Sequence, residues 1–194
     1  MNWPKPLILA STSPRRRELL ALAGIDAITL SPKIDDSHFV CGTMSPREWV
    51  TTLAILKASS ICGSSDLEEG TVLSADTVCV VDGNILGQPK SATDARKMII
   101  SMTNTSHEVL TGWCLKTMDG QHSKYGCELT IVKIGEINQE DIDTYMESGM
   151  WQGKAGGYNL SERHYAGWPL TWQGDPTSVM GLPMHRLTVE LTRK

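Results

Sequence analysis

The sequence predicts a mixed α/β fold, and two observations lead to that prediction. Short apolar runs of strand length alternate along the chain with stretches that carry helix-capping residues and an apolar stripe at helical spacing. Turn sequences such as Asp82-Gly83-Asn84 and Asp119-Gly120 join neighbouring strands into hairpins. Because hairpins place strands antiparallel, they exclude a purely parallel sheet.

The N-terminal third is expected to hold one strand and two helices. Residues 7–10, Leu-Ile-Leu-Ala, read as a short buried strand. The helix that follows has Ser13 as its cap, Pro14 at its first position and Gly24 just beyond its end. Ser45-Pro46-Arg47-Glu48 is a capping box that begins the second helix.

The middle of the chain predicts more strands than helices. Strands are expected over 71–75 and 78–86, with Asp76 between them and a bend in the second at Asp82-Gly83-Asn84. Ser91 opens a further helix, and a long hairpin is expected from His107 to Gly135.

The last part of the chain changes in composition. Asn138 caps a helix that ends near Glu147, after which residues 149–181 are rich in glycine and tryptophan. That composition predicts a functional loop region or a packed irregular segment, and not a linker. Pro183 begins a final helix that runs to Lys194.

Length and composition set limits on the class of protein. A chain of 194 residues is near the size of one large domain or a two-lobed one. The net charge of −4 argues against a nucleic-acid binder, which usually needs a basic face. The five cysteines are odd in number and lack CxxC spacing, which favours a reducing compartment over a disulfide or zinc framework. We find no signal peptide and no membrane-spanning stretch, so we expect a cytoplasmic protein without a membrane partner.

Asp76 is the first candidate for chemistry. It follows the apolar run 71–75 and precedes a second apolar run, 78–81. A carboxylate between two buried strand segments is costly unless its charge is used, either to activate water or to hold a metal. A cap or turn aspartate gives the same pattern, so from spacing alone both interpretations stay open.

The turn from Ser11 to Glu18 is the second candidate. It joins a strand to a helix N-terminus and contains Arg15, Arg16 and Arg17. Free backbone N–H groups and the helix dipole attract an anion there, and arginine adds bidentate phosphate contacts. Three cations at the positive end of a helix favour a bound anion over a purely solvated turn.

Other candidates are weaker by themselves. Lys57 on a helix face is most often a surface lysine. His107, His164 and His185 lack the spacing of metal ligands, so a structural role is favoured for each. The run 154–158, Lys-Ala-Gly-Gly-Tyr, either brings backbone close to a ligand or forms a tight turn.

Taken together, these segments resemble the Maf family of nucleotide pyrophosphatases. The matching motifs run in order along nearly the whole chain and are Leu9-Ala10-Ser11-Thr12-Ser13-Pro14-Arg15-Arg16-Arg17-Glu18-Leu19-Leu20, Leu53-Ala54-Ile55-Leu56-Lys57-Ala58, Ala75-Asp76-Thr77-Val78, Asp82-Gly83-Asn84-Ile85-Leu86-Gly87-Gln88-Pro89, His107-Glu108-Val109-Leu110-Thr111-Gly112, Gly153-Lys154-Ala155-Gly156-Gly157-Tyr158 and Val179-Met180-Gly181-Leu182-Pro183.

The resemblance implies an α/β fold with a two-lobed mixed sheet and flanking helices, related to inosine-triphosphate pyrophosphatases, with a cleft between the lobes. It implies one Maf-like domain over residues 1–194. The implied reaction cleaves a nucleoside triphosphate, the expected partner, to the monophosphate and pyrophosphate. The implied cofactor is a divalent cation, Mg²⁺, Mn²⁺ or Co²⁺, and a homodimer is left open as the assembly.

The resemblance also implies roles for individual residues. Asp76 would be the catalytic acceptor that activates water, and it would bind the metal together with Asp36. The residues implied to hold the substrate and its phosphates are Ser11, Arg15, Lys57, Gln88 and Lys154.

Three departures from the family pattern bear on activity. The family commonly has Gly-Lys-Pro where this chain has Gly87-Gln88-Pro89, so a phosphate-facing cation is lost. Ser161 stands where the family usually has glutamine, and Asp36 where it usually has a longer glutamate. Weaker activity or an altered substrate follows as an expectation.

Base preference depends on a few positions. Arg15 and Thr77 match two of the three specificity positions of the branch that acts on dTTP and UTP. Ser161-Glu162 resembles a Ser-Glu pair of the branch that acts on 7-methyl-GTP, one residue out of register. We predict a preference for dTTP and UTP; the alternatives are the 7-methyl-GTP branch and a catalytically weakened nucleotide-binding regulator.

Overall fold

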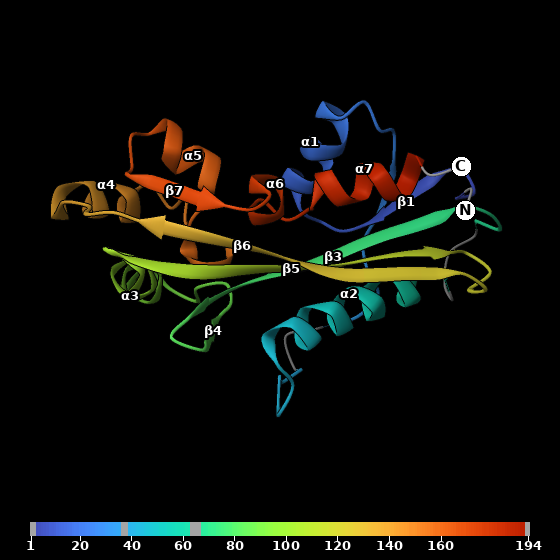
Figure 1. Cartoon of the computed structure of the whole chain (residues 1–194), viewed down its shortest axis with the longest axis horizontal. Helices are drawn as coiled ribbons and strands as arrows, with labels where there is room; N and C mark the ends of the chain where they lie inside the picture. The colour runs from blue at the N-terminus through green and yellow to red at the C-terminus, as the bar shows by residue number, and fades with distance from the viewer. Residues whose placement is uncertain (1–2, 36–38, 63–66, 193–194) are drawn as a thin grey trace.

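The computed structural model describes residues 3–35, 39–62 and 67–192, and its centre is one mixed sheet (Figure 1). Its strands are β1 Leu7–Ala10, β2 Ile28–Leu30, β3 Thr71–Val81, β4 Asn84–Leu86, β5 Thr105–Thr117, β6 Ser123–Ile134 and β7 Leu170–Gln173. In the described part the order is β2-β1-β3-β5-β6-β7, with β4 paired to β3. The pairings of β1 with β2 and β3 are parallel and the others antiparallel, which confirms the predicted mixed sheet.

The helices flank the sheet on both faces. They are α1 Pro14–Leu22, α2 Pro46–Cys62, α3 Ala92–Met102, α4 Gln139–Glu147, the 3₁₀ turn η2 Ala155–Gly157, α5 Leu160–Tyr165, α6 Pro176–Val179 and α7 Met184–Thr192. Within the described ranges no helix is long and apolar enough to cross a membrane.

The side chains of β1 point alternately to the two faces of the sheet, and each set packs against a different layer of helices. Leu7 and Leu9 pack with α1 and α7 on one face of β1, whereas Ile8 and Ala10 pack with α2 on the other. Successive strand residues point to opposite faces, so a strand with helices on both sides reads as a continuous apolar run. That is why residues 7–10 are apolar throughout.

The other half has a separate core around the far ends of β3, β5 and β6. Apolar residues of α3 and α4 pack there with Tyr158, Leu160 and Leu170. In Figure 1, α3, α4 and α5 gather about one end of the long strands, and α1, α7 and β1 lie toward the other. This arrangement confirms the predicted two-lobed fold with flanking helices.

The predicted turns and caps are largely confirmed. Asp82 and Gly83 both have positive φ, 48° and 77°, as a two-residue hairpin turn requires. The side chains of Ser91 and Asn138 accept the expected capping bonds from Asp94 N and Asp141 N. Ser13 is the first exception: it occupies the N-cap position of α1, but its side chain makes no capping bond with described residues.

A second exception concerns Asp76. The prediction of two strands separated at this residue is wrong, because β3 runs unbroken from Thr71 to Val81. Asp76 is paired in the ladder opposite Gly112 of β5. A mid-strand carboxylate is tolerated here because its side chain is partly exposed and forms an ion pair, as described below.

Candidate active site

A cavity of about 760 Å³ lies between the two halves. Its volume falls within the range of roughly 300–1,000 Å³ that is typical of small-molecule sites. The described residues that line it include predicted site residues from several elements, namely Ser11, Arg15, Lys57, Asp76, Thr77, Gln88 and Glu162. The structure therefore brings together segments that are far apart in the sequence.

The pairing of β3 explains where the cavity forms. On the edge of β3 away from β5, β1 pairs with residues up to Leu73, and β4 pairs from Cys79 onward. The residues 74–78 lie between these two partners, where no described strand pairs with this edge of β3. Both Asp76 and Thr77 line the cavity there, although they leave the strand on opposite faces.

Asp76 forms an ion pair with Lys57 of α2. Lys57 Nζ lies 2.5 Å from Asp76 Oδ1, and the two side chains are only 14% and 15% exposed. Gly112, opposite Asp76, allows this approach, because a Cβ there would lie 2.3 Å from the backbone oxygen of Val50 in α2. The glycine therefore lets α2 lie close against the sheet beside the aspartate.

The turn after β1 is organised by a serine and an arginine. Ser11 Oγ accepts hydrogen bonds from the Ser13 N–H at 3.1 Å and from Arg16 Nη1 at 3.2 Å. Arg16 Nε also donates to the Gly181 carbonyl at 2.9 Å. Sequence reasoning did not single out Arg16 from its neighbours, and its link to a residue 165 positions away left no local signal.

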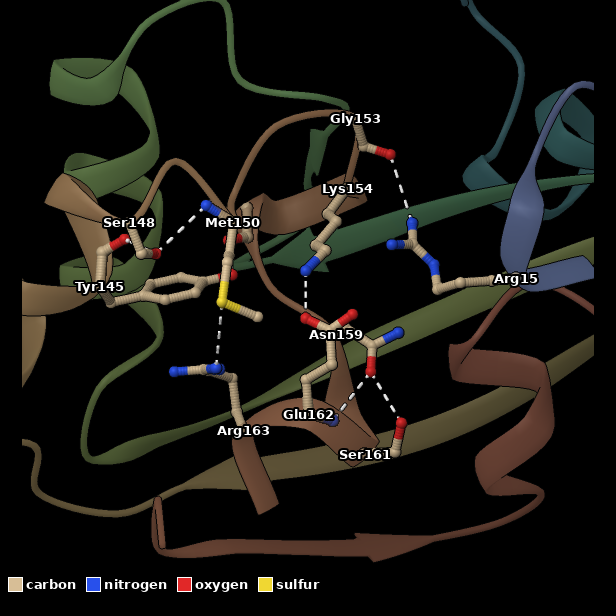
Figure 2. Close-up of polar contacts among 11 residues, drawn as sticks. Arg15, Tyr145, Ser148, Met150, Gly153, Lys154, Asn159, Ser161, Glu162 and Arg163 are labelled. Atoms are coloured by element: carbon tan, nitrogen blue, oxygen red, sulfur yellow. Dashed lines mark hydrogen bonds and ion pairs between the residues drawn. The ribbon is translucent and has the colours of Figure 1, made fainter. Parts of the chain in front are cut away.

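Arg15 reaches from α1 to the glycine-rich segment. Its Nη2 donates to the Gly153 carbonyl at 3.3 Å, and Figure 2 shows the guanidinium beside the Lys154–Glu162 pair. Because this contact is exposed, a bound anion could replace the carbonyl as the partner of Arg15.

Lys154 and Glu162 form an ion pair at the cavity wall (Figure 2). Glu162 lines the cavity, whereas the Lys154 side chain is buried behind it with 7% exposure. Burial lowers the pKa of Lys154, and the hydrogen bond to Glu162 opposes that shift. In this structure the Lys154 ammonium is therefore paired with the Glu162 carboxylate.

Ser161 does not point toward Lys154 or Glu162. Its hydroxyl donates to Asn159 Oδ1 at 2.8 Å, and the same oxygen accepts the capping bond from the Glu162 N–H (Figure 2). Asn159, which the sequence did not indicate as a site residue, lines the cavity and caps α5. Ser161 therefore supports this cap.

Thr77 and Gln88 complete the predicted lining. Thr77 Oγ1 lies 2.9 Å from Thr111 Oγ1, which itself donates to the Ser178 carbonyl at 2.8 Å. Gln88 lines the cavity, and nearby Lys90 is exposed.

The glycine run 155–157 packs against the strand that carries the site. Gly156 has a φ of +67°, and a Cβ there would lie 2.7 Å from Cys79 Sγ. Its N–H donates to the Gly87 carbonyl at 3.0 Å, next to Gln88. Of the two interpretations of this run, a close approach to a ligand or a tight turn, the structure shows a turn packed on β3.

A buried histidine lies behind this wall. His107 is 2% exposed, and its Nε2 lies 2.7 Å from the hydroxyl of Tyr158, a cavity residue. Burial lowers the pKa of His107 to about 4. The imidazole is therefore neutral at pH 7, in agreement with the structural role favoured from the sequence.

The described carboxylates do not form a metal centre on their own. Among residues 3–35, 39–62 and 67–192, no group of three or more His, Cys, Asp or Glu side chains could hold a metal ion. Asp36, the second predicted metal ligand, lies outside the described residues. Asp76 does line the cavity, and Mg²⁺ is commonly held by one or two carboxylates together with substrate phosphates.

Sequence comparisons match nearly the whole chain to known proteins. The family model described as Maf-like protein matches residues 6–194. A dTTP/UTP pyrophosphatase of Symbiobacterium thermophilum is 39% identical over 96% of this chain and 93% of its own length. The dTTP/UTP pyrophosphatase of Pyrococcus abyssi is 36% identical, over 96% of this chain and 95% of its own length.

A solved structure also shows a distant likeness. It is a nucleoside-triphosphatase, a dITP/XTP pyrophosphatase from Mycobacterium abscessus, at 14% identity and a TM-score of 0.41, covering 68% of this chain and 74% of that one. The match to the family model covers residues 6–194, and all the described residues that line the cavity lie within this range. The chain belongs to the Maf-like family.

Proposed function

We propose that this protein hydrolyses nucleoside triphosphates to the monophosphate and pyrophosphate, with dTTP and UTP as substrates. The observation that carries the proposal is the cavity itself, in which the Asp76–Lys57 ion pair faces the same space as the Ser11–Arg16 turn. The names of the relatives, dTTP/UTP pyrophosphatases at 36% and 39% identity, support it independently.

The turn after β1 suits the binding of phosphate. The first N–H groups of an α-helix lack intrahelical partners and carry the positive end of its dipole. In α1 the Ser13 side chain does not cap these groups within the described structure, and Ser11 and Arg15 lie beside them at the cavity. On substrate binding Arg15 exchanges its contact with the Gly153 carbonyl for a phosphate oxygen.

Asp76 is the proposed proton acceptor. Its Oδ1 is held by Lys57, which leaves Oδ2 to accept a proton from the attacking water. The water oxygen forms a bond to the α-phosphorus as the bond from that phosphorus to the bridging oxygen breaks, and pyrophosphate leaves. Lys57 balances the charge on the carboxylate and on the nearby phosphate oxygens.

The residues at this site fit a divalent cation that is shared between one carboxylate and the substrate phosphates. Asp76, with the phosphate oxygens of the substrate, would hold it, and the bound ion would neutralise charge on those oxygens. Asp36 stays the proposed second ligand. The cytoplasmic location and the homodimer also stay predictions.

Pyrophosphate release from a panel of nucleotides tests the proposal. The panel contains dTTP, UTP, CTP, GTP, ATP and 7-methyl-GTP, each with Mg²⁺, Mn²⁺ and Co²⁺. We expect dTTP and UTP to be cleaved fastest, with one pyrophosphate released per monophosphate. If 7-methyl-GTP were cleaved fastest, the protein would instead belong to the branch that acts on 7-methyl-GTP. Binding without release would favour the nucleotide-binding regulator, for which the glutamine at position 88 is the specific observation.

A further inference from the structure

The side chain of Asn159 is held in one orientation at the N-terminus of α5. Its Oδ1 accepts the Glu162 N–H at 3.0 Å and the Ser161 hydroxyl at 2.8 Å. Because a backbone N–H can only donate, the atom that it meets must be the amide oxygen and not the amide nitrogen. Figure 2 shows this nitrogen turned away from Ser161, on the side where Arg15 lies.

This orientation gives the cavity a hydrogen-bond donor in a fixed position. Asn159 lines the cavity and is only 4% exposed, so its side chain has little freedom to move. Its Oδ1 is used within α5, whereas Nδ2 makes no hydrogen bond to any residue that the structure describes. An amide nitrogen donates and does not accept. A ligand that contacts Asn159 from the cavity must therefore supply an acceptor.

The neighbouring charges disfavour phosphate as that acceptor. Glu162 lies in the first turn of the same helix and also lines the cavity. The cation closest to its carboxylate, Lys154, is already paired with it. A phosphate brought to Asn159 would approach this carboxylate, and like charges repel. A neutral acceptor such as a ring carbonyl meets no such repulsion.

The cavity wall around Asn159 also has an apolar part. Cys79, Val109 and Tyr158 belong to the core of this half of the molecule and line the cavity, and Val179 packs against the same core. Ligand sites commonly combine apolar surface, which packs against the ligand, with a few polar groups that fix its orientation. A flat heterocyclic ring that carries a carbonyl group suits both features of this wall.

We propose that Asn159 Nδ2 donates a hydrogen bond to a ring carbonyl of the bound pyrimidine. Uracil and thymine carry a carbonyl on each side of the ring N3–H, so either face of this ring edge offers an acceptor. The inference rests on the proposed function, because it names a group that would hold the base of dTTP or UTP in the cavity.

Two substitutions remove the donor without removing the helix cap. Asn159→Ser and Asn159→Asp both delete Nδ2 and keep an oxygen that can cap α5. Asn138→Ser is the matched control, because Asn138 Oδ1 caps α4 by accepting the Asp141 N–H at 2.8 Å. Asn138 is not among the described residues that line the cavity. A general effect of a weaker cap should therefore be common to both serine variants.

The first readout compares two ligands by calorimetry. They are α,β-methylene-UTP, which is not cleaved at the scissile bond, and the same triphosphate analogue without its base. We expect Asn159→Ser and Asn159→Asp to weaken binding of the UTP analogue about fivefold relative to the analogue without a base. The ratio removes any effect of the added charge in Asn159→Asp on the phosphates. Asn138→Ser should leave the ratio unchanged.

The second readout identifies the carbonyl. The 2-thio and 4-thio forms of α,β-methylene-UTP each replace one ring oxygen by sulfur, which is a weak acceptor. Wild-type protein should bind one of the two about fivefold more weakly than the parent analogue. Asn159→Ser should bind that thio form and the parent equally, because the donor that distinguishes them is gone.

Equal weakening of the ligands with and without a base would overturn the inference, because Asn159 would then hold the ribose or a phosphate. An unchanged ratio in Asn159→Ser, the same change in Asn138→Ser, or no binding of α,β-methylene-UTP to the wild type would also overturn it. Binding of these analogues does not depend on turnover. Absence of pyrophosphate release together with the expected binding ratios would therefore refute the proposed function and leave the contact with the base supported.

Discussion

Asp76 and Thr77 are neighbours in β3, yet their side chains leave opposite faces of the sheet. Asp76 lies opposite Gly112 and pairs with Lys57 of α2, and Thr77 lies opposite Thr111 and leads to α6. Both reach one cavity because no described strand covers the edge of β3 between Leu73 and Cys79. Two consecutive residues therefore line one cavity from opposite faces of the sheet.

Asp76→Asn should abolish turnover and leave nucleotide binding nearly intact. The amide keeps the shape of the side chain but cannot take the proton of the attacking water, so kcat should fall by about 10²–10⁴-fold. Steady-state pyrophosphate release and calorimetric binding of α,β-methylene-UTP would measure the two effects. Asp143→Asn, at an exposed ion pair with Arg96, is the control. A variant at position 76 with near wild-type kcat would show that Asp76 is not the base.

Gln88→Lys should raise kcat/KM by a few-fold. A charged donor to a phosphate oxygen is about twice as strong as a neutral one, and Gln88 lines the cavity. Lys90 is exposed, and its backbone N–H donates to Asp94, so Lys90→Ala should change kcat/KM little. The single variants and the double variant should be compared on UTP. If Gln88→Lys gave no gain while Lys90→Ala crippled the enzyme, Lys90 would already supply the missing charge.

The predicted and the missed site residues differ in how their roles arise. Ser11, Arg15, Asp76 and Thr77 lie in motifs whose residue types already suggest phosphate or water chemistry, and all of them line the cavity. Arg16, Thr111 and Asn159 act through partners that only the fold brings near. No periodicity or capping rule could have indicated the bond from Arg16 to Gly181.

At the scale of elements, the helices and the strand of segment 149–181 could not be predicted from local sequence signals. Its helices and strand are short, and long-range contacts hold them: β7 pairs with β6 in the register Val132↔Trp172, and η2 packs on Cys79 of β3. Short elements have little intrinsic stability, so the sequence could predict only an irregular packed segment. The longer helices with their caps, and the hairpin from β5 to β6, were predictable because their signals are local.

Gly156→Ala should destabilise the protein more than Gly149→Ala. Both residues have positive φ, +67° and +66°, but only at position 156 would the new Cβ meet an atom, Cys79 Sγ at 2.7 Å. We expect backbone strain to lower the free energy of unfolding by about 1 kcal/mol in both variants. The steric contact at position 156 should lower it by about 1–3 kcal/mol more. Urea unfolding would measure the free energy of each variant.

The partner substitution isolates the steric part of this effect. Cys79→Ala removes the sulfur atom, so it should recover part of the loss in the Gly156→Ala background. Equal destabilisation by the two glycine variants would contradict the proposed packing of η2 on β3.

At the scale of the whole molecule, the two halves share their long strands but have separate cores, and the buried His107–Tyr158 pair belongs to the half built on α3 and α4. Burial lowers the pKa of His107 to about 4, below the ordinary value of 6.5. As pH falls from 6.5 toward 4, the unfolded chain takes up a proton that the folded chain does not. Stability should therefore be lost over that interval, by up to about 3 kcal/mol, with no further loss from this group below pH 4.

His107→Gln provides the comparison, because glutamine does not titrate but can still hydrogen-bond to Tyr158. The free energy of unfolding of both proteins should be measured by urea between pH 7 and pH 4. The wild-type curve should fall relative to that of the variant as the pH is lowered. Parallel curves would show that His107 is not held neutral in the folded protein.

The central claim is that water, activated by Asp76, attacks the α-phosphorus of a pyrimidine nucleoside triphosphate bound between the two halves. Hydrolysis of UTP in ¹⁸O-labelled water, followed by mass spectrometry of both products, tests it most directly. We predict that one ¹⁸O atom enters UMP and that the released pyrophosphate stays unlabelled. Label in pyrophosphate, or release of orthophosphate from the terminal position, would contradict the claim.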